Sequence, residues 1–208
     1  YVEVMSKFTP INPSELINMQ DSAERMAKAL CDILWCKEKM VDEIKHILKD
    51  SFPVAKPFES ICKLSDRSPI ILTQAPIRSN SMCPHHFLPV QYEVFIAIKI
   101  PTGGESNDAS VFGLSKYSRA VKVLAKRPVL QEQYARDIVE LFTLGTVGGT
   151  ERLHTQTVDG CMVILSGSHG CMSCRGIESD TPTQTVYSIG MNEQDQNQAW
   201  NLYNGRNR

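Results

Sequence analysis

The sequence lacks a long hydrophobic run, and no segment approaches the roughly 18 to 20 apolar residues that span a bilayer. It also lacks an excess of charge, because the formal net charge is -1 at pH 7. A general basic surface for nucleic acid or anionic lipid is therefore not expected, and any anion site must be local. The first residues, YVEVMSKFTP, contain no hydrophobic region of a secretion signal. We expect a cytoplasmic protein that binds neither nucleic acid nor a membrane.

The chain has seven cysteines, so they cannot all be paired in disulfides within one chain. An odd number without a secretion signal favours reduced thiols over a disulfide framework. Cys31 and Cys36 lie in an apolar helical pattern, and we expect both to be ordinary buried residues. There is no Walker or Rossmann glycine pattern. What remains is a chain of 208 residues, 42% hydrophobic and 22% charged, which is typical of a globular protein with a core.

The order of helical and strand-like patterns predicts the fold class. Residues 13–49 are predicted to be helical, because apolar residues recur there at helical spacing. The predicted strands are 68–74, 90–100, 161–167 and 183–190, and the predicted helices between them are 115–126 and 129–144. Strands, then two helices, then strands indicate an α+β protein whose antiparallel sheet carries helices on one face. We expect an amino-terminal helical region at 1–60, one domain at 61–190, and a polar tail at 191–208 that is frayed or disordered.

Two segments, SMCPHHF and SHGCMSCRG, concentrate thiols and imidazoles. Cys83 and His86 are three residues apart, and the second segment supplies His169, Cys171 and Cys174. Zinc takes cysteine and histidine ligands in tetrahedral sites, and a catalytic site keeps one position for water. Both thiols of the CxxC pair would close a structural site, whereas Cys171 alone would leave the fourth position open. The spacing leaves both arrangements possible.

The imidazoles beside these candidate ligands suit proton transfer. His85 and His169 are such residues, and a neutral imidazole with a pKa near 6.5 exchanges protons at cellular pH. The alternative is that one of them only donates a hydrogen bond to a ligand.

Charged residues in three other places suit recognition of an anionic nucleotide. Lys116 and Arg119 share one face of a predicted helix near its start, where backbone N–H groups also favour phosphate. The alternative is a solvated basic helix. Arg175, four residues after Cys171, adds a cation near the metal-binding segment. Glu132 either complements a helix dipole or accepts hydrogen bonds from a purine edge.

In this order, the segments resemble the signature of the GTP cyclohydrolase I family, which reads SxCEHHxxP, GLSKxxR, QE and HxCMxxRG. The chain has SMCPHHFLP, GLSKYSR, QE and HGCMSCRG, and the resemblance covers about residues 68–190. It implies the tunnelling fold (T-fold), preceded by amino-terminal helices, and a homodecamer whose active sites lie between subunits. The chain departs from the pattern at Pro84, which replaces glutamate, and at 133–135, which read QYA in place of RLT. We expect a divergent member.

The resemblance implies a zinc ion held by Cys83, His86 and Cys171, with proton transfer by His85 and His169. It also implies substrate-binding roles. The triphosphate would be held by Ser115, Lys116, Arg119 and Arg175, and the guanine by Glu132 with Gln131 beside it.

The implied reaction is hydrolysis of GTP at guanine C8, release of formate and rearrangement to 7,8-dihydroneopterin triphosphate, from which folate, biopterin and deazaguanine routes begin. Two alternatives remain. One is a zinc-binding T-fold subunit without full activity, and the other is a T-fold nitrile reductase.

Overall fold

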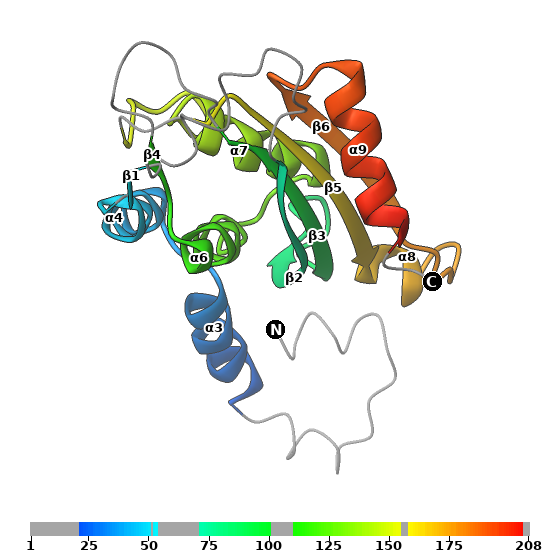
Figure 1. Cartoon of the computed structure of the whole chain (residues 1–208). Coiled ribbons are helices and arrows are strands. Elements are labelled where there is room, and N and C mark those ends of the chain that lie inside the picture. The colour runs from blue at the N-terminus through cyan, green and yellow to red at the C-terminus, as the bar shows by residue number, and fades with distance from the viewer. Residues whose placement is uncertain (1–20, 51, 54–70, 101–109, 155–157, 206–208) are drawn as a thin grey trace, which may run out of the picture. The chain divides into compact units, whose positions relative to one another are not determined.

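The computed structural model describes residues 21–50, 52–53, 71–100, 110–154 and 158–205 (Figure 1). The chain forms two compact units, Tyr1–Trp35 and Cys36–Arg208. The first part of the predicted helical region 13–49 lies outside the described residues, as do residues 68–70 of the first predicted strand.

Four strands form the central sheet in the order β2-β3-β5-β6, and every neighbouring pair is antiparallel. Their bounds are β2 Ile71–Met82, β3 Pro89–Lys99, β5 Gly160–His169 and β6 Thr183–Ile189. Two short strands, β1 (Phe52–Pro53) and β4 (Ser110–Val111), pair separately. The prediction of an α+β protein with an antiparallel sheet is confirmed.

Strand β2 is longer than the predicted strand 68–74, because it continues to Met82 past an irregularity between Gln74 and Ile77. Its second half alternates buried and exposed positions, but the buried ones include serines. Ser79 shares a hydrogen bond with the Tyr134 hydroxyl at 3.0 Å, and Ser81 donates to a backbone oxygen. These buried serines have hydrogen-bond partners, so this part of the strand lacks the alternation of apolar residues from which a strand is predicted.

Helices α6 (Leu114–Leu124) and α7 (Gln131–Thr143) connect β3 to β5 and lie against one face of the sheet (Figure 1). Alternate residues of β3 and β5, which share a face because side chains alternate along a strand, are buried on this side. They include Val94, Ile96, Val163 and Leu165. Helix α4 (Lys37–Leu48) packs on α6 through an apolar stripe that includes Met40 and Ile44. The two helices predicted on one face are confirmed.

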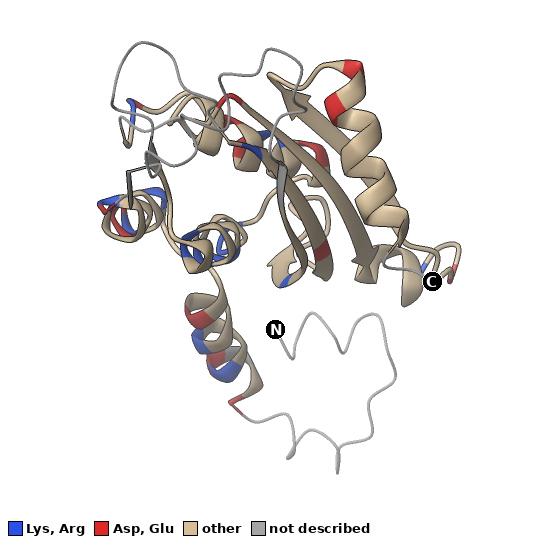
Figure 2. Cartoon of the chain, viewed as in Figure 1, with Lys and Arg blue, Asp and Glu red and all other residues tan. Residues whose placement is uncertain are grey.

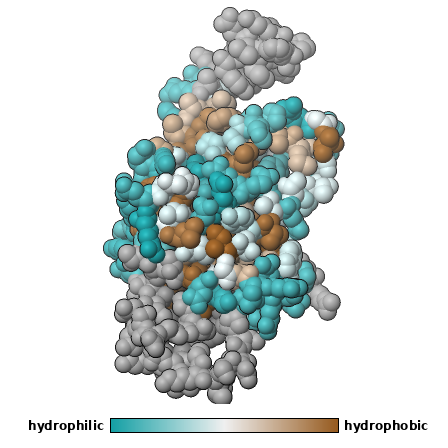
Figure 3. Space-filling view, turned by 90° about the horizontal axis from the view of Figure 1, so that it is seen from above, coloured by the Kyte–Doolittle hydropathy of each residue, from teal (hydrophilic) through white to brown (hydrophobic). Residues whose placement is uncertain are grey.

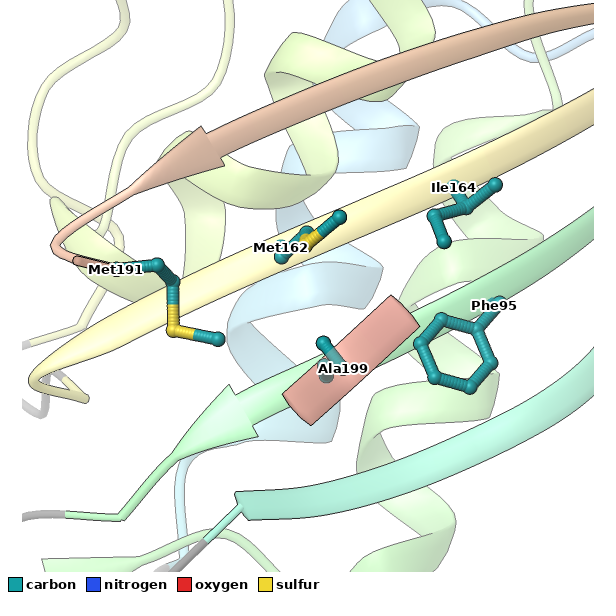
Figure 4. Close-up of a cluster of buried hydrophobic side chains, with 6 residues drawn as sticks. Phe95, Met162, Ile164, Met191 and Ala199 are labelled. Atoms are coloured by element: carbon teal, nitrogen blue, oxygen red, sulfur yellow. The ribbon is translucent and has the colours of Figure 1, made fainter. Parts of the chain in front are cut away.

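The other face of the sheet carries α9 (Glu193–Asn204), so the expectation of a frayed tail is wrong for these residues. Figure 4 shows Ala199 of α9 near Phe95, Met162 and Ile164 of the sheet, which belong to one buried cluster. Trp200 also packs against this cluster. Apolar periodicity did not predict this helix, because most of its residues are polar. A capping box, rather than an apolar pattern, marks its start.

The amino-terminal unit contains helix α3 (Ser22–Ile33), and Leu34 then adopts an extended conformation. The predicted single helix across 13–49 is therefore two helices in the described part. The expectation that Cys31 and Cys36 are buried is wrong, because both are exposed. Cys36 precedes the first turn of α4 as its N-cap, outside the stripe that the helix buries.

Hydrophobic side chains remain on the surface in places. On the face shown in Figure 3 they form small groups surrounded by more polar residues. Among the described helices, none combines the length and apolar character needed to cross a bilayer.

A buried ion pair fastens the start of α9 to the sheet and generates a prediction. The Lys99 amine lies 2.8 Å from the Asp195 carboxylate, which is fully buried and also accepts from the Asn192 amide. We expect Asp195→Ala to lower the free energy of unfolding in urea by about 3 kcal/mol, because it leaves a partly buried charge unpaired. The control Glu93→Ala removes an exposed pair with Arg78 and should cost less than about 1 kcal/mol. Equal losses of unfolding free energy in Asp195→Ala and Glu93→Ala would contradict the stabilising role of the Lys99–Asp195 pair.

Candidate functional site

The register of the sheet brings the two cysteine- and histidine-containing segments together. Val90, at the start of β3, is paired with His169, at the end of β5. The chain enters β3 through a turn that contains Cys83, and it leaves β5 into the short helix α8 (Gly170–Ser173). At Gly170 a β-carbon would lie 2.9 Å from the backbone oxygen of Pro89, so glycine permits this close approach.

The turn before β3 is closed by two backbone hydrogen bonds. The Cys83 N–H donates to Leu88 at 2.9 Å, and the Phe87 N–H donates to Cys83 at 2.8 Å. Neither bond uses the amide of residue 84, so Pro84 occupies a position that needs no donor. The replacement of the family's glutamate by Pro84 is therefore compatible with the backbone of this turn.

Three potential ligand atoms converge at this edge of the sheet. The sulfurs of Cys83 and Cys171 and a ring nitrogen of His169 all lie within 4.8 Å of one another. Ligand atoms about 2.0 to 2.3 Å from one zinc ion have separations of this order. The donor set therefore fits a divalent metal that accepts sulfur and nitrogen ligands.

The other histidines and the third thiol of the two segments lie differently. His86 is exposed and is not part of the three-residue group, whereas His85 Nδ1 lies 3.8 Å from the Cys83 sulfur. Cys174 is exposed, and its thiol donates to the Gly170 backbone oxygen at 2.6 Å. Cys171 is therefore among the three converging ligand atoms, whereas Cys174 and His86 are not.

A glutamine holds His169 in one orientation. Gln131 is 5% exposed, and its side-chain NH₂ donates to the Thr183 backbone oxygen at 3.0 Å and to the Thr185 hydroxyl at 3.1 Å. Its Oε1 therefore faces His169 Nε2, at 2.8 Å, and can only accept. Nε2 carries the hydrogen, which leaves Nδ1 with the free lone pair in the neutral ring. Nothing in the sequence spacing indicated this contact.

Burial and neighbouring charges shift the pKa values of the site. Burial lowers the pKa of His169 below 6.5, and the negative charge of Glu132 partly opposes this. Burial raises the pKa of Cys171, and the adjacent Cys83 raises it further, while Arg175 acts in the opposite sense. The Cys171 thiol therefore resists ionisation until a cation lies beside it, and a bound metal would remove that resistance.

These groups line a cavity of about 240 Å³. Six of the predicted site residues are among its lining residues, namely Cys83, His85, Gln131, Glu132, His169 and Cys171. Arg175 is exposed and follows α8, close enough to Cys171 to affect its pKa.

The predicted phosphate-binding residues of α6 do not line this cavity. The Lys116 amine contacts the backbone oxygen of Asp50 and lies 3.6 Å from its carboxylate, and the Lys116 side chain is only 13% exposed. Arg119 lies 3.9 Å from Glu43 of α4. Ser115 is exposed on the first turn of α6. Figure 2 shows both signs of charge on α4 and basic residues on α6.

Comparisons with known proteins agree on one family. The family model described as GTP cyclohydrolase I matches residues 14–205. GTP cyclohydrolase 1 of Streptococcus sanguinis is 31% identical over 188 residues, which cover 88% of this chain and 85% of that protein. GTP cyclohydrolase 1 of Bacillus subtilis is 38% identical over 116 residues, 54% of this chain and 53% of that protein. The chain thus spans about half the length of the Bacillus relatives that it matches.

Solved structures are also similar. One of them is described as the crystal structure of the archaeosine synthase QueF-Like in the apo form, and it has a TM-score of 0.40 and 15% identity. The similarity covers 60% of this chain and 97% of that chain.

The environment of His169 predicts its titration in metal-free protein. Its pKa, measured by NMR, should lie below 6.5, and Glu132→Gln should lower it further by removing the opposing charge. The pKa of His169 is lower in the folded state than in the unfolded state, so the residue stabilises the fold at pH values above its unfolded-state pKa. This contribution is lost as the pH falls through the folded-state pKa. Glu140→Gln, on the same helix, is the control. A pKa that rises in Glu132→Gln would contradict the electrostatic account.

Proposed function

Because the chain belongs to the GTP cyclohydrolase I family, which has the tunnelling fold, we propose that it is a zinc-dependent GTP cyclohydrolase I. The reaction would hydrolyse GTP at guanine C8, release formate and yield 7,8-dihydroneopterin triphosphate. The observation that carries the proposal is the convergence of Cys83, Cys171 and His169 in a cavity that also contains Glu132.

We propose Cys83, Cys171 and His86 as the zinc ligands. The thiols are already together, and His86 lies on the same short turn as Cys83. Zinc bound there would act as a Lewis acid that makes water nucleophilic near neutral pH. His169 is the competing candidate for the nitrogen ligand, because its ring nitrogen lies with the two sulfurs.

His169 is proposed to move a proton to or from the guanine ring as the bond at C8 is cleaved. Gln131 supports this role by fixing the hydrogen on Nε2, so that Nδ1 is the nitrogen available for exchange. A lowered pKa keeps the ring neutral near pH 7, which suits a group that both accepts and returns a proton. His85, which also lines the cavity, is proposed to serve proton transfers on the ribose side.

Glu132 is proposed to recognise guanine. Its carboxylate is exposed and lines the cavity beside His169. An ionised carboxylate can accept hydrogen bonds from guanine N1–H and N2–H together. The Gln131 side chain is engaged with His169 and β6, so we expect Gln131 to affect guanine binding through His169 rather than through its own amide.

The triphosphate is proposed to lie between subunits. A cavity of about 240 Å³ is smaller than the roughly 300 Å³ at which pockets for drug-sized ligands begin. Lys116 and Arg119 lie outside it; Lys116 contacts Asp50, which follows α4, and Arg119 contacts Glu43 of α4. We therefore propose that Ser115, Lys116 and Arg119 of one subunit bind the phosphates in the site of a neighbour, where Arg175 adds a further cation. The proposed assembly is a homodecamer.

Activity tests the proposed reaction. Zinc-loaded protein incubated with GTP should release formate and, after oxidation of the product, fluorescent pterin in equal amounts. We expect His169→Ala to lower the rate about 10²- to 10⁴-fold, since that is the usual effect of a general acid or base. Cys171→Ala should abolish zinc binding and turnover, while Cys174→Ala, which removes the neighbouring exposed thiol, should retain both. Stoichiometric zinc with neither product would instead indicate a zinc-binding subunit without this activity.

Metal content separates the two candidate nitrogen ligands. If His86 is the ligand, His86→Ala should lose zinc on dialysis against a weak chelator, whereas His169→Ala should keep about one zinc per chain but lack activity. Zinc is measured by atomic emission on each protein. Loss of zinc from His169→Ala and full retention by His86→Ala would overturn the assignment and make His169 the ligand.

A further inference from the structure

The Thr183 hydroxyl lies at the cavity, and the proposed reaction assigns it no role. Thr183 is the first residue of β6, is exposed, and is paired across the sheet with Gly167 of β5. It is among the residues that line the cavity. Its hydroxyl lies 2.9 Å from Gln131 Oε1 and 3.3 Å from the backbone oxygen of Gly167. The shorter contact directs the hydroxyl to the glutamine that holds His169.

Two donors therefore meet at one amide oxygen. The Thr183 hydroxyl and His169 Nε2–H both donate to Gln131 Oε1, at 2.9 Å and 2.8 Å. A carbonyl oxygen has two lone pairs, so these bonds use its full capacity. The NH₂ of the same amide donates to the Thr183 backbone oxygen and the Thr185 hydroxyl. The buried Gln131 amide is thus fully bonded within the protein, and β6 commits it to His169.

Strand β5 leaves room for this arrangement. A β-carbon at Gly167 would collide with Gln131 Oε1 and would lie 2.9 Å from the Tyr92 ring. A side chain at this position would therefore push the amide oxygen away from Thr183 and His169. Glycine at residue 167 keeps the oxygen within reach of both donors.

We propose that Thr183 is a positioning residue for His169 and acts through Gln131. Its hydroxyl occupies the second lone pair of Oε1 and so keeps the amide in the orientation that holds the imidazole. A residue that orients the proton-transfer group should affect kcat more than the binding of GTP. This inference rests on the proposed function, because it takes His169 as the residue that moves the proton.

Substitution of Thr183 separates this role from a contact with the substrate. Thr183→Val removes the hydroxyl and keeps a β-branched side chain, which suits a strand. We expect kcat for GTP to fall about threefold to tenfold, which corresponds to one hydrogen bond between neutral groups. KM should change less than about twofold. Thr183→Ser, which keeps the hydroxyl, should restore kcat.

Three kinetic results would overturn the inference. A raised KM with unchanged kcat in Thr183→Val would mean that the hydroxyl binds the substrate directly. Wild-type values of both constants would mean that it has no role. A loss of kcat that Thr183→Ser does not repair would assign the effect to the side chain's shape rather than to its hydroxyl.

A double-mutant cycle tests whether Thr183 acts through Gln131. Gln131→Met is similar in size and has no amide, so it breaks the connection to His169. In this background Thr183→Val should cause no further loss of kcat, because the two substitutions interrupt one connection. Losses that multiply would mean that Thr183 acts by another route, and would overturn the inference.

Thr181→Val is the matched control. It makes the same substitution two residues earlier, at an exposed hydroxyl that accepts a hydrogen bond from Ser179 at 3.0 Å. Thr181 is not among the residues that line the cavity. Its kcat and KM should equal those of wild type. A loss of kcat equal to that in Thr183→Val would mean that any change before or in β6 has this effect, and would overturn the inference.

Crystal structures of the metal-free proteins give a readout that needs no activity. In wild type and Thr183→Ser, the Gln131 amide and the His169 ring should each keep one orientation, with Oε1 and Nε2 2.8 Å apart. In Thr183→Val we expect a second orientation of at least one of them. A single, unchanged orientation in Thr183→Val would overturn the inference.

Failure of the inference is distinguishable from failure of the proposed function. If wild type forms formate and pterin and Thr183→Val does so equally well, the inference fails and the proposed function stands. If wild type forms neither product, the proposed function fails, and the crystal structures still decide whether Thr183 positions His169.

Discussion

The site depends on the antiparallel pairing of β3 with β5. This pairing sets Val90 opposite His169, and it therefore fixes the turn that carries Cys83 against the segment that carries Cys171. A shift of one residue in a strand would turn every side chain of that strand to the opposite face and would separate His169 from Gln131. Both faces of the sheet are covered along much of its length, by α6 and α7 on one side and by α9 on the other, and this covering resists such a shift.

Helix α7 supports the edge of the sheet where Cys83, His169 and Cys171 converge. Its first residue, Gln131, orients His169, and its Tyr134 hydroxyl donates to the Val121 backbone oxygen of α6. The buried Asp137 pairs with Arg127, whose backbone oxygen accepts from Ser81 close to the Cys83 turn. The polar groups around the site therefore belong to one packed arrangement of two helices and three strands. Such an arrangement holds the imidazole and thiols in place before any ligand arrives.

The sequence predicted the sheet and the two helices over one face, because apolar periodicity is local. The spacing of the cysteines did not choose between Cys171 and Cys174, and only the resemblance to a family signature implied that Cys83 and Cys171 share a site. The sequence did not predict α9, since that helix is polar and is held by a capping box and the Lys99–Asp195 pair. The sequence also did not predict contacts between residues that are far apart along the chain.

Those missed contacts include the bond from His169 to Gln131 and the edge-to-face contact of the Tyr92 and His169 rings. A glutamine in a predicted helix and a tyrosine in an alternating strand carry no mark of either contact. The contacts of Lys116 with Asp50 and of Arg119 with Glu43 likewise depend on how α4 and α6 pack. These contacts depend on how helices and strands pack together. The periodicity of apolar residues along the sequence does not specify that packing.

The central claim is that two cysteines from separate segments hold one metal ion at this edge of the sheet. X-ray absorption at the zinc edge of metal-loaded protein tests it most directly, because sulfur and nitrogen neighbours differ in distance. The account predicts two sulfurs at about 2.3 Å, with nitrogen or oxygen at about 2.0 to 2.1 Å completing the shell. A shell without sulfur, or with three sulfurs, would contradict it.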